Sequence, residues 1–397
     1  MFIKQLNLVN FRNIDNLTLK PGRKLNFVTG HNGAGKTSIL EAIFLVSHQR
    51  SFKSKKGALV QEGKDNLAVY MQVDNDRNID HNLGVKIDSK LALTNYLDGA
   101  KVEAKETSKL LAVQLIAPDI IQLIDGTPEF RRRYLNWGMF YHYVDFIDLW
   151  RKTENLHKNR NSYLKQFKDY LDSGKRIPES ELQAYQGYIT NLVTYSEELN
   201  LKYEKYFALL AEKVQDLLKI FLPEIPITLE YERGWKNDSS LAQILESRFE
   251  QDVYSGWARY GIHRFDLSIK CFNLPASEIL SRGQQKLLAI ALKMAQVDIL
   301  YEHAQEDCIF VIDDIAAELD QNKQKLFATK LLSNPSQIFM SYIDNSGLNI
   351  FNGLIDTWDE FSLEKGKLTH HLVNGEEVIS QEFNLDQYFT DNEKEPA

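Results

Sequence analysis

The chain has 397 residues, 43% of them hydrophobic and 26% charged, and a formal net charge of −8. This composition is typical of a folded globular protein and allows roughly two or three domains. It contains no apolar run near the roughly 18 residues that span a bilayer, and its first residues lack the basic segment and apolar core of a signal peptide. We therefore expect a cytosolic (cytoplasmic) protein with no membrane partner. The acidic balance argues weakly against a protein coated in nucleic acid, although local basic patches would still allow DNA binding.

The N-terminal third of the chain is rich in predicted strands. Residues 1–30 alternate in short strand-like runs, of which 3–9 and 17–19 are the clearest. Residues 66–104 read in the same way, and Asp98 and Gly99 form a dipeptide typical of a hairpin turn. These regions predict a β-rich element on both sides of residues 25–38.

Residues 25–38 read as an apolar strand, a glycine-rich loop and the start of an apolar helix. Gly30, Gly35, Lys36 and Thr37 fit the G-x-x-x-x-G-K-S/T pattern of a P-loop, in the strand–loop–helix context that the motif requires. Glycines let backbone N–H groups close around phosphate oxygens, and the helix N-terminus attracts the same anions. We expect Lys36 to reach the outer phosphates and Thr37 to ligate Mg²⁺. The segment predicts binding of a nucleoside triphosphate by Gly30, His31, Asn32, Gly33, Ala34, Gly35, Lys36, Thr37 and Ser38.

Basic residues are concentrated in a few places. Arg50–Lys56 holds four cations within seven residues, and Arg131–Arg133 and His157–Arg160 follow. The arginines at 131–133 fall at the predicted start of a helix, where the helix dipole disfavours cations. That position favours a binding or pairing role for them over a merely solvated face.

Apolar residues recur at three- and four-residue spacing from about Glu129 to Leu222. Residues 172–178 break this pattern, and Pro223 ends it. The segment therefore predicts a long helical hairpin of roughly 90 residues, whose apolar stripe we interpret as core packing. Strand-like runs resume at 227–231.

A second anion site is predicted at residues 280–287, ahead of an apolar helix pattern. Ser281 can cap that helix, and Gly283 lets a ligand approach the backbone closely. A capped helix N-terminus attracts anions, but a single P-loop already holds the γ-phosphate. The segment is therefore either an ordinary capped helix or a site for a nucleotide bound to another subunit.

Residues 308–314 supply the other half of the nucleotide site, because an apolar run ends in Asp313 and Asp314. A carboxylate at the end of a buried strand holds Mg²⁺ in P-loop enzymes, so we assign Asp313 to the metal and Asp314 to orienting the attacking water. With Lys36, they make up the predicted catalytic residues. Many related ATPases carry the longer glutamate at the position of Asp314, so we predict slow turnover.

Cys271 and Cys308 have neither metal-ligand nor disulfide spacing, and Cys308 reads as a core thiol.

The order of these motifs, with P-loop first, then Ser-x-Gly-Gln and then an aspartate-ended strand, resembles the ABC-type ATPase head. In that family, the signature segment of one protomer closes over the P-loop of the other, so that two ATP molecules are sandwiched between them. Asn10–Asn13 reads Asn-Phe-Arg-Asn and resembles an early motif of the SMC-like DNA-repair branch. This likeness implies that Arg12 touches phosphate.

More specific segments resemble the RecF family of bacterial recombination mediators, in the right order from residue 1 to about 360. They are 117–119, 126–133, 135–138, 231–235, 261–264, 280–286 and 312–320. The resemblance implies an ATP-dependent homodimer that clamps duplex DNA near single-strand gaps and acts with RecR and RecO to load RecA. It also implies that Gly30–Ser38 bind ATP with Mg²⁺ at Thr37 and Asp313, that Ser281, Gly283 and Gln284 reach the nucleotide of the partner, and that Ala317–Asp320 crosses the dimer seam.

Several further positions are assigned under this resemblance. Arg50, Lys53, Lys55 and Lys56 are the best candidates for DNA contact, with a solvated loop as the alternative. His263 and Arg264 would contact DNA or the signature loop, or serve as a structural turn. Ser341 stands where ABC transporters place a histidine, and Gln61 is a weak candidate for the glutamine that senses Mg²⁺.

We thus expect an α/β fold: an ABC-type ATPase head with mixed β-sheet flanks and an inserted helical lobe. The predicted domains are a discontinuous ATPase domain of residues 1–115 and 226–364, a helical lobe of 116–225 and a polar, acidic tail of 365–397. The main alternative is the ATP-binding subunit of an ABC transporter or another ABC-type ATPase. An SMC-like structural protein would need several hundred residues of coiled coil, and a nuclease of the overcoming-lysogenisation type would need an added acidic domain after the ATPase.

Overall fold

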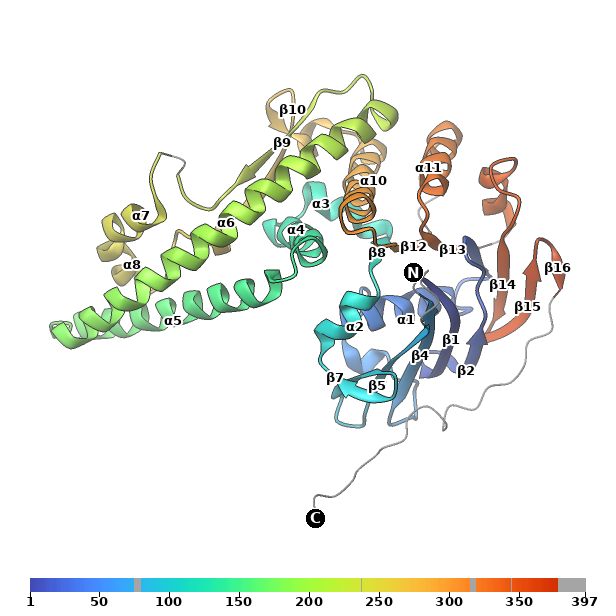
Figure 1. Cartoon of the computed structure of the whole chain (residues 1–397), viewed down its shortest axis with the longest axis horizontal. Helices are drawn as coiled ribbons and strands as arrows, with labels where there is room; N and C mark the ends of the chain where they lie inside the picture. The colour runs from blue at the N-terminus through green and yellow to red at the C-terminus, as the bar shows by residue number, and fades with distance from the viewer. Residues whose placement is uncertain (75–79, 237, 315–318, 344, 378–397) are drawn as a thin grey trace, which may run out of the picture. The chain divides into compact units, whose positions relative to one another are not determined.

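The computed structural model describes residues 1–74, 80–236, 238–314, 319–343 and 345–377 (Figure 1). The chain forms two compact units: unit 1 comprises Met1–Ile120 and Leu300–Ala397, and unit 2 comprises Ile121–Ile299. Unit 2 is thus inserted between the two segments of unit 1, as an α/β head with an inserted lobe requires. Among the described residues, no helix is both long and apolar enough to cross a bilayer.

Unit 1 contains a seven-stranded sheet whose middle strands are parallel. Its order is β16-β15-β14-β3-β13-β12-β8, and β3, β8, β12, β13 and β14 run parallel. The apolar run of β12 and the complete burial of β3 suit strands that are covered on both faces. The bounds are β3 (Leu25–Thr29), β8 (Val113–Ile116), β12 (Ile309–Asp313), β13 (Gln337–Tyr342), β14 (Asp359–Glu364), β15 (Lys367–Val373) and β16 (Glu376–Glu377).

The predicted strands of the N-terminal third form a second, antiparallel sheet, ordered β2-β1-β4-β5-β6-β7. The predicted hairpin is confirmed: Asp98 and Gly99 join β6 to β7 with φ values of 50° and 84°. The bounds are β1 (Phe2–Phe11), β2 (Ile14–Leu19), β4 (Leu67–Asp74), β5 (Asp80–Ile87), β6 (Leu93–Leu97) and β7 (Ala100–Val102).

Helix α1 (Lys36–His48) packs against strands of both sheets, and every side chain from Ser38 to Ser47 is buried. A helix that is apolar on all sides belongs in a core, which explains why its sequence shows little amphipathic pattern. The core of unit 1 accordingly lies around α1, between the sheets. The smaller helices of this unit are η1 (Lys56–Ala58), α2 (Ala104–Leu110), η2 (Pro118–Ile121), η4 (Leu300–Ala304), α11 (Gln321–Ser333) and η6 (Asn345–Phe351).

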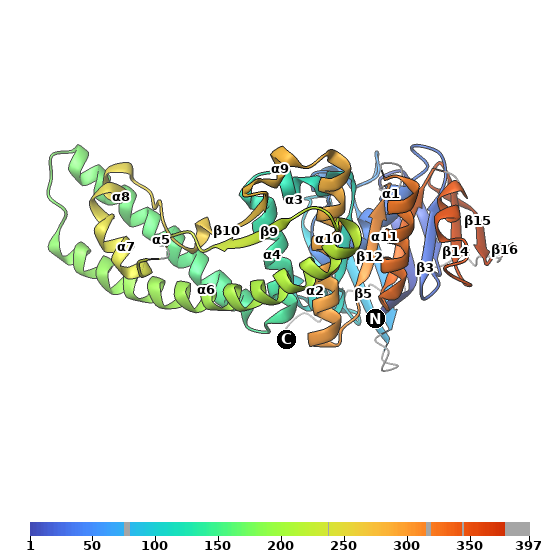
Figure 2. The same ribbon diagram turned by 90° about the horizontal axis from the view of Figure 1, so that it is seen from above.

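Unit 2 contains the predicted helical hairpin, since α5 and α6 lie side by side in Figures 1 and 2. Helix α10 packs on α6, and strands β9, β10 and β11 form a small antiparallel sheet. The bounds are α3 (Gln122–Asp125), α4 (Pro128–His142), α5 (Phe146–Asp172), α6 (Glu179–Phe221), β9 (Ile227–Glu232), α7 (Leu241–Ser247), α8 (Phe249–Ser255), η3 (Ile262–Arg264), β10 (Asp266–Cys271), β11 (Leu274–Pro275), α9 (Ala276–Ile279) and α10 (Arg282–Ile299).

A buried ion pair fixes α8 to the hairpin. Arg160 of α5 donates to Asp252 of α8 at 2.7 Å and to the hydroxyl of Tyr185 of α6 at 3.1 Å. Both charged side chains are almost fully buried. The cation that ends the basic run 157–160 is therefore part of the core rather than of a solvated face.

The compact units differ from two of the predicted domain boundaries. Residues 226–299 belong to unit 2 rather than to the predicted ATPase domain, because β9 pairs with β10 and α10 packs on α6. The predicted acidic tail begins too early, since residues 367–377 form strands that extend the sheet from β14. Only His371 of β15 is buried and both residues of β16 are exposed, so the sequence of this edge hairpin looks like a polar tail. Residues 378–397 of that predicted tail lie outside the described part of the chain.

Candidate nucleotide-binding site

Three features of unit 1 lie at the carboxyl ends of three neighbouring strands. The P-loop follows β3, Ser341 lies near the end of β13, and Asp313 ends β12. In the sheet register, Asp313 is opposite Ser341, which in turn is opposite Val28. Loops and side chains at this edge of a parallel sheet face one crevice, where α/β proteins bind their ligands.

The conformation of the P-loop requires glycine at two positions. Gly30 has a φ of 143°, and a Cβ there would lie 2.4 Å from the carbonyl oxygen of Leu363 in β14. Gly35 has a φ of 112° at the N-terminal cap of α1. The N–H of Gly366, in the turn after β14, donates to the carbonyl of Ala34 at 2.8 Å. The edge hairpin that the sequence presented as a tail therefore supports the P-loop.

Lys36 lies across the loop that it follows. Its Nζ donates to the carbonyl oxygens of Gly30 at 2.5 Å and His31 at 3.1 Å. Burial lowers the pKa of Lys36 below its ordinary value, and the carboxylates of Asp314 and Asp313 oppose that shift. The ammonium is thus held over the concave face of the loop by acceptors that a phosphate oxygen could replace.

Thr37 and Asp313 come together as an oxygen donor pair. The hydroxyl of Thr37 lies 3.3 and 3.2 Å from the two carboxylate oxygens of Asp313. The hydroxyl of Ser341 donates to Asp313 at 2.7 Å and accepts from the N–H of Asp314 at 3.1 Å. Mg²⁺ takes one or two protein oxygens together with substrate phosphates, so this donor set beside a phosphate loop fits the ion. The role of Ser341 was missed, because nothing local in the sequence shows that β13 lies between β3 and β12.

Arg12 is held by a residue that the sequence analysis overlooked, Glu41 of α1. The Arg12 guanidinium donates to both carboxylate oxygens of Glu41, through Nε and through Nη2 at 2.8 Å, and also to the hydroxyl of Ser54 at 2.8 Å. Ser51 donates a further hydrogen bond to Glu41. Glu41 is fully buried. Its signal in the sequence was an acid inside an otherwise apolar helical run.

We expect Arg12→Ala to destabilise unit 1 by about 3–5 kcal/mol, because it leaves the buried Glu41 carboxylate without its guanidinium partner. The double variant Arg12→Ala/Glu41→Ala should recover much of that loss. Urea unfolding of both variants and of Glu41→Ala measures this as a double-mutant cycle. A loss for the double variant equal to the sum of the losses for Arg12→Ala and Glu41→Ala would show that the pair is not coupled.

Asn13 is a second overlooked support of the loop. Its amide donates to the carbonyl of Gly33 at 3.0 Å and accepts from the hydroxyl of Ser38 at 3.1 Å. The side chain thus bridges the P-loop and the first turn of α1. Within the sequence it stood out only as part of the Asn-Phe-Arg-Asn motif.

These residues surround a cleft of about 620 Å³. It is lined by Arg12, Asn13, Asn32, Gly33, Gly35, Lys36, Thr37, Ser38, Lys53, Pro118, Asp313, Asp314, Ser341, Tyr342 and Ile343. Of the predicted DNA contacts, Lys53 lies in this cleft, whereas the exposed Arg50, Lys55 and Lys56 are not among its lining residues. Gln61 is not among them either, and its backbone N–H donates to the carbonyl of Asn10 at 2.9 Å.

The predicted signature segment lies in unit 2, at the start of α10. Ser281 caps the helix as predicted: its hydroxyl accepts from the N–H of Gln284 at 3.4 Å, and the Gln284 side chain accepts from the N–H of Ser281 at 2.8 Å. A Cβ on Gly283 would meet no atom within 4 Å, so the backbone there is open to a ligand. In the predicted seam loop, Ala317 and Glu318 lie outside the described residues, and Asp320 caps α11 through the N–H of Lys323 at 3.0 Å.

The arginines at the start of α4 have partners within unit 2. Arg131 donates to both carboxylate oxygens of Asp266, at 2.9 and 2.7 Å. Arg133 pairs with Glu129, and Arg132 donates to the carbonyl of Phe265 at 3.2 Å. Arg131 and Arg133 are thus paired with acids, whereas Arg132 bonds to a backbone carbonyl.

Known proteins resemble this chain in both sequence and fold. A family model described as the RecF/RecN/SMC N terminal domain matches residues 2–359. The DNA replication and repair protein RecF of Haemophilus ducreyi is 33% identical over 381 residues, covering 94% of this chain and 99% of the relative. The RecF of Salmonella paratyphi B is 33% identical over 380 residues, covering 93% of this chain and 100% of the relative.

Solved structures resemble the whole chain. The recombination mediator protein RecF with ATP, from the RecFOR pathway, superposes with a TM-score of 0.80 at 22% identity and covers 95% of this chain and 98% of that one. An SMC head bound to the C-terminal winged-helix domain of ScpA gives a TM-score of 0.57 at 15% identity, covering 94% and 97%. These likenesses show the fold of an SMC-like ATPase head, and none of the matches supports the transporter alternative. Because the family model matches residues 2–359 and relatives one-third identical match almost end to end, the chain belongs to the RecF family within the RecF/RecN/SMC group.

Proposed function

We propose that this protein is an ATP-dependent DNA-binding protein of recombinational DNA repair and replication, working in the cytoplasm. The observation that carries the proposal is the meeting of the P-loop, Thr37 and Asp313 at one sheet edge in a RecF-family chain. We further propose that ATP binds with Mg²⁺ between Thr37 and Asp313 and that hydrolysis is weak, Mg²⁺-dependent and stimulated by DNA. Asp314 would orient the attacking water, with a shorter reach than glutamate has.

ATP is proposed to act by joining two copies of the chain. The P-loop of unit 1 is proposed to hold one triphosphate, and the capped N-terminus of α10 with open space at Gly283 supports a second anion site in unit 2. This second site is useful if it closes on the nucleotide of another protomer. The resulting homodimer would clamp duplex DNA near single-strand gaps and help RecR and RecO to load RecA.

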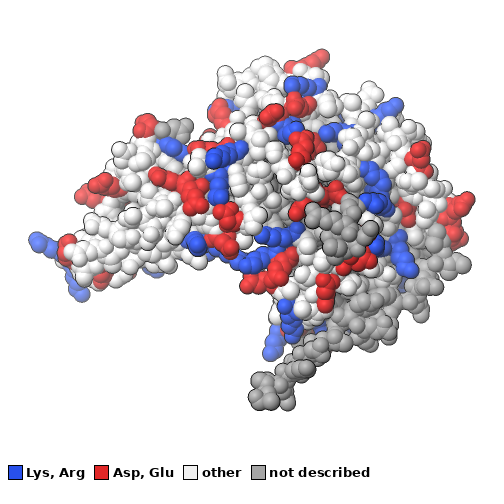
Figure 3. All heavy atoms as spheres, viewed as in Figure 1, with Lys and Arg blue, Asp and Glu red and all other residues white. Residues whose placement is uncertain are grey.

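DNA contacts are proposed to be local rather than spread over the surface. On the face shown in Figure 3, basic and acidic side chains are interspersed, in keeping with the net charge of −8. Arg50, Lys55 and Lys56 are exposed in the loop after α1, and they are the proposed phosphate contacts. Lys53 remains a proposed DNA contact, and it also lines the nucleotide cleft.

The test is a size measurement of the full chain with and without ATP and Mg²⁺, repeated with duplex DNA. We expect the mass to double with ATP and Mg²⁺, DNA affinity to rise in parallel, and that affinity to fall steeply as salt increases. Lys55→Glu/Lys56→Glu should weaken DNA binding and leave dimerisation unchanged. If ATP neither dimerises the chain nor changes its affinity for DNA, the proposed mechanism is wrong.

A further inference from the structure

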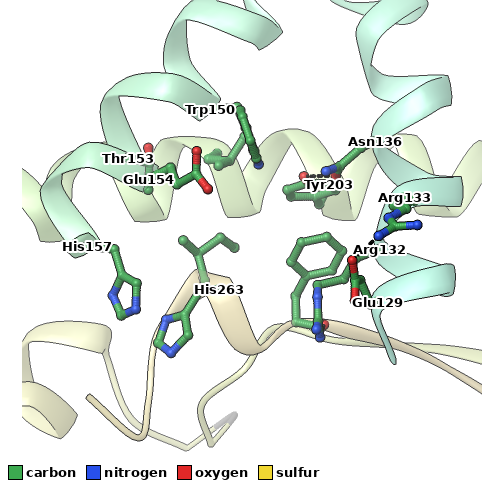
Figure 4. Close-up of a pocket in the computed structure, with 13 residues that line it drawn as sticks. Glu129, Arg132, Arg133, Asn136, Trp150, Thr153, Glu154, His157, Tyr203 and His263 are labelled. Carbon is green, nitrogen blue, oxygen red and sulfur yellow. Dashed lines mark hydrogen bonds and ion pairs between the residues drawn. The ribbon is translucent and has the colours of Figure 1, made fainter. Parts of the chain in front are cut away.

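Unit 2 contains a second pocket, of about 450 Å³, walled by α4, α5, α6 and the segment around η3 (Figure 4). This volume is within the range of about 300–1,000 Å³ that is usual for small-ligand sites. The walls are largely rings: Trp150 from α5, Tyr203 from α6, Phe265, and the imidazoles of His157 and His263. Figure 4 shows the two imidazoles at one end of the pocket and Arg132 at the other. A planar aromatic ligand is the shape and chemistry that such walls favour.

The two histidines serve as a neutral aromatic wall. Their rings are stacked, with centroids 3.5 Å apart and planes inclined by 21°. Burial, together with nearby Arg160 and Arg264, lowers the pKa of His157 to about 4. Burial, the neighbouring imidazole and Arg264 lower the pKa of His263 to about 2. Both rings are therefore uncharged at neutral pH, and the pocket presents π faces there rather than cations.

The charges around the pocket do not cancel completely. Glu129 pairs with Arg133, and Glu154 lies 3.4 Å from Lys158. The Arg132 guanidinium has only the carbonyl of Phe265 as a hydrogen-bond partner and no ion pair with an acid, as far as the described residues go. A partly exposed cation with spare N–H donors is thus available in the pocket wall, which suits an anionic ligand such as a phosphate.

Polar groups along the pocket could read the edge of a heteroaromatic ring. The Tyr203 hydroxyl donates to Oδ1 of Asn136 at 2.5 Å, which orients the Asn136 amide and leaves its N–H₂ group as a donor. Glu154 offers carboxylate oxygens as acceptors for an exocyclic amine, and Figure 4 shows it between Trp150 and Thr153. Ring walls, edge-reading donors and acceptors, and a cation for phosphate are together the features that bind nucleobases in single strands.

We propose that this pocket binds one unpaired nucleobase of single-stranded DNA, with Arg132 contacting an adjoining phosphate. The inference rests on the proposed DNA-binding function and adds a site for the unpaired side of a gap. An aromatic side chain of a partner protein would use the rings but leave Arg132 unmatched, so a nucleotide fits the pocket better. A strand is favoured over a free nucleotide because the chain already has a separate triphosphate cleft at the P-loop.

The experiment uses the full chain with ATP and Mg²⁺ and a duplex carrying a single-stranded extension with 2-aminopurine at successive positions. We expect the fluorescence at one position to be quenched on binding, since stacking on the partly exposed Trp150 quenches this base analogue. Replacing that base by an abasic residue should weaken binding about ten-fold, whereas binding of fully duplex DNA should not change. This arm needs no protein variant, so it does not depend on whether a substituted chain folds.

Two substitutions test whether the quenching arises in this pocket. Trp150→Ala and Arg132→Gln should each weaken binding of the extended duplex and reduce the quenching, while duplex binding is kept. The matched control is Trp257→Ala, which removes an exposed tryptophan of unit 2 that does not line the pocket. It should behave like the unmodified protein.

Several outcomes overturn the inference. Equal affinity for the abasic and normal extensions would refute base binding by this pocket, and so would unchanged quenching in Trp150→Ala. Continued binding of fully duplex DNA would leave the proposed function unaffected. Displacement of the strand by a free deoxynucleotide at equal affinity would assign the pocket to mononucleotides instead. If the unmodified protein binds neither the fully duplex DNA nor the duplex with the single-stranded extension, the proposed function fails and the pocket assignment fails with it.

Discussion

Replacing Lys36 by arginine should reduce ATP hydrolysis by at least about a hundred-fold while the protein stays folded. The ammonium of Lys36 lies between the carbonyls of Gly30 and His31, at 2.5 and 3.1 Å, inside the curve of the P-loop. A planar guanidinium is larger and presents its donors in a fixed fork, so it cannot take the same place over the outer phosphates. Phosphate release at saturating ATP measures turnover, and calorimetry with a non-hydrolysable analogue measures binding.

Lys53→Arg is the matched control for this substitution. Lys53 lines the same cleft, yet it is exposed and belongs to the loop after α1 rather than to the P-loop. The same change of an ammonium into a guanidinium there keeps the positive charge on an exposed side chain outside the P-loop, so it should lower turnover by much less than Lys36→Arg does. Hydrolysis at the unmodified rate in Lys36→Arg would remove Lys36 from the catalytic assignment.

The parts of the site that the sequence predicted are those whose residues are neighbours in the chain. The P-loop needs only a strand, a glycine-rich turn and a helix in succession, and Asp313 needs only an apolar strand before it. Because carboxyl ends of parallel strands meet at one edge, these two local patterns were enough to place Thr37 beside Asp313. The long helices were predictable for the same reason, since their periodicity is local.

The supporting contacts of the site join residues that are far apart in the chain. Arg12 reaches Glu41 across 29 positions, and Ser341 reaches Asp313 across 28. Neither pairing leaves a local pattern. The sequence singles out Arg12 through its Asn-Phe-Arg-Asn motif and Ser341 through its position, but it gives no sign of the partner of either residue. The edge hairpin that supports the P-loop through Gly366 was read as a tail, because strands covered on one face only carry few apolar residues.

The number of cations in the sequence overestimates how much basic surface stays unpaired after folding. Arg131 and Arg160 lie in basic clusters, but each binds an aspartate more than 90 positions away, Asp266 and Asp252 respectively. A run of cations shows how much charge is present and not how much of it is neutralised after folding. The cluster at 50–56 differs, because Lys55 and Lys56 are exposed at the end of a loop and at the start of η1.

Replacing Ser281 by arginine should abolish ATP-driven dimerisation and leave ATP binding by the monomer almost unchanged. Ser281 is exposed at the cap of α10, so a long side chain can extend into solvent, and the lost cap should cost only about 1 kcal/mol. In the proposed dimer, the same arginine would occupy the place of the partner's γ-phosphate at Gly283. Light scattering with ATP and Mg²⁺ measures the dimer, and calorimetry with a non-hydrolysable analogue measures monomer binding.

Ser240→Arg is the control that separates the effect of losing a helix cap from the effect of blocking the dimer interface. Ser240 caps α7 with the same reciprocal bonds to Gln243, at 3.2 and 3.0 Å, that Ser281 makes with Gln284. Both variants should therefore lose similar stability, but only Ser281→Arg should stay monomeric with ATP, because only α10 carries the signature sequence. If Ser281→Arg dimerises at the ATP concentrations that dimerise the unmodified protein, Ser281 does not act on the nucleotide of the partner. Loss of monomer ATP binding together with the dimer would instead place Ser281 at the nucleotide of its own chain.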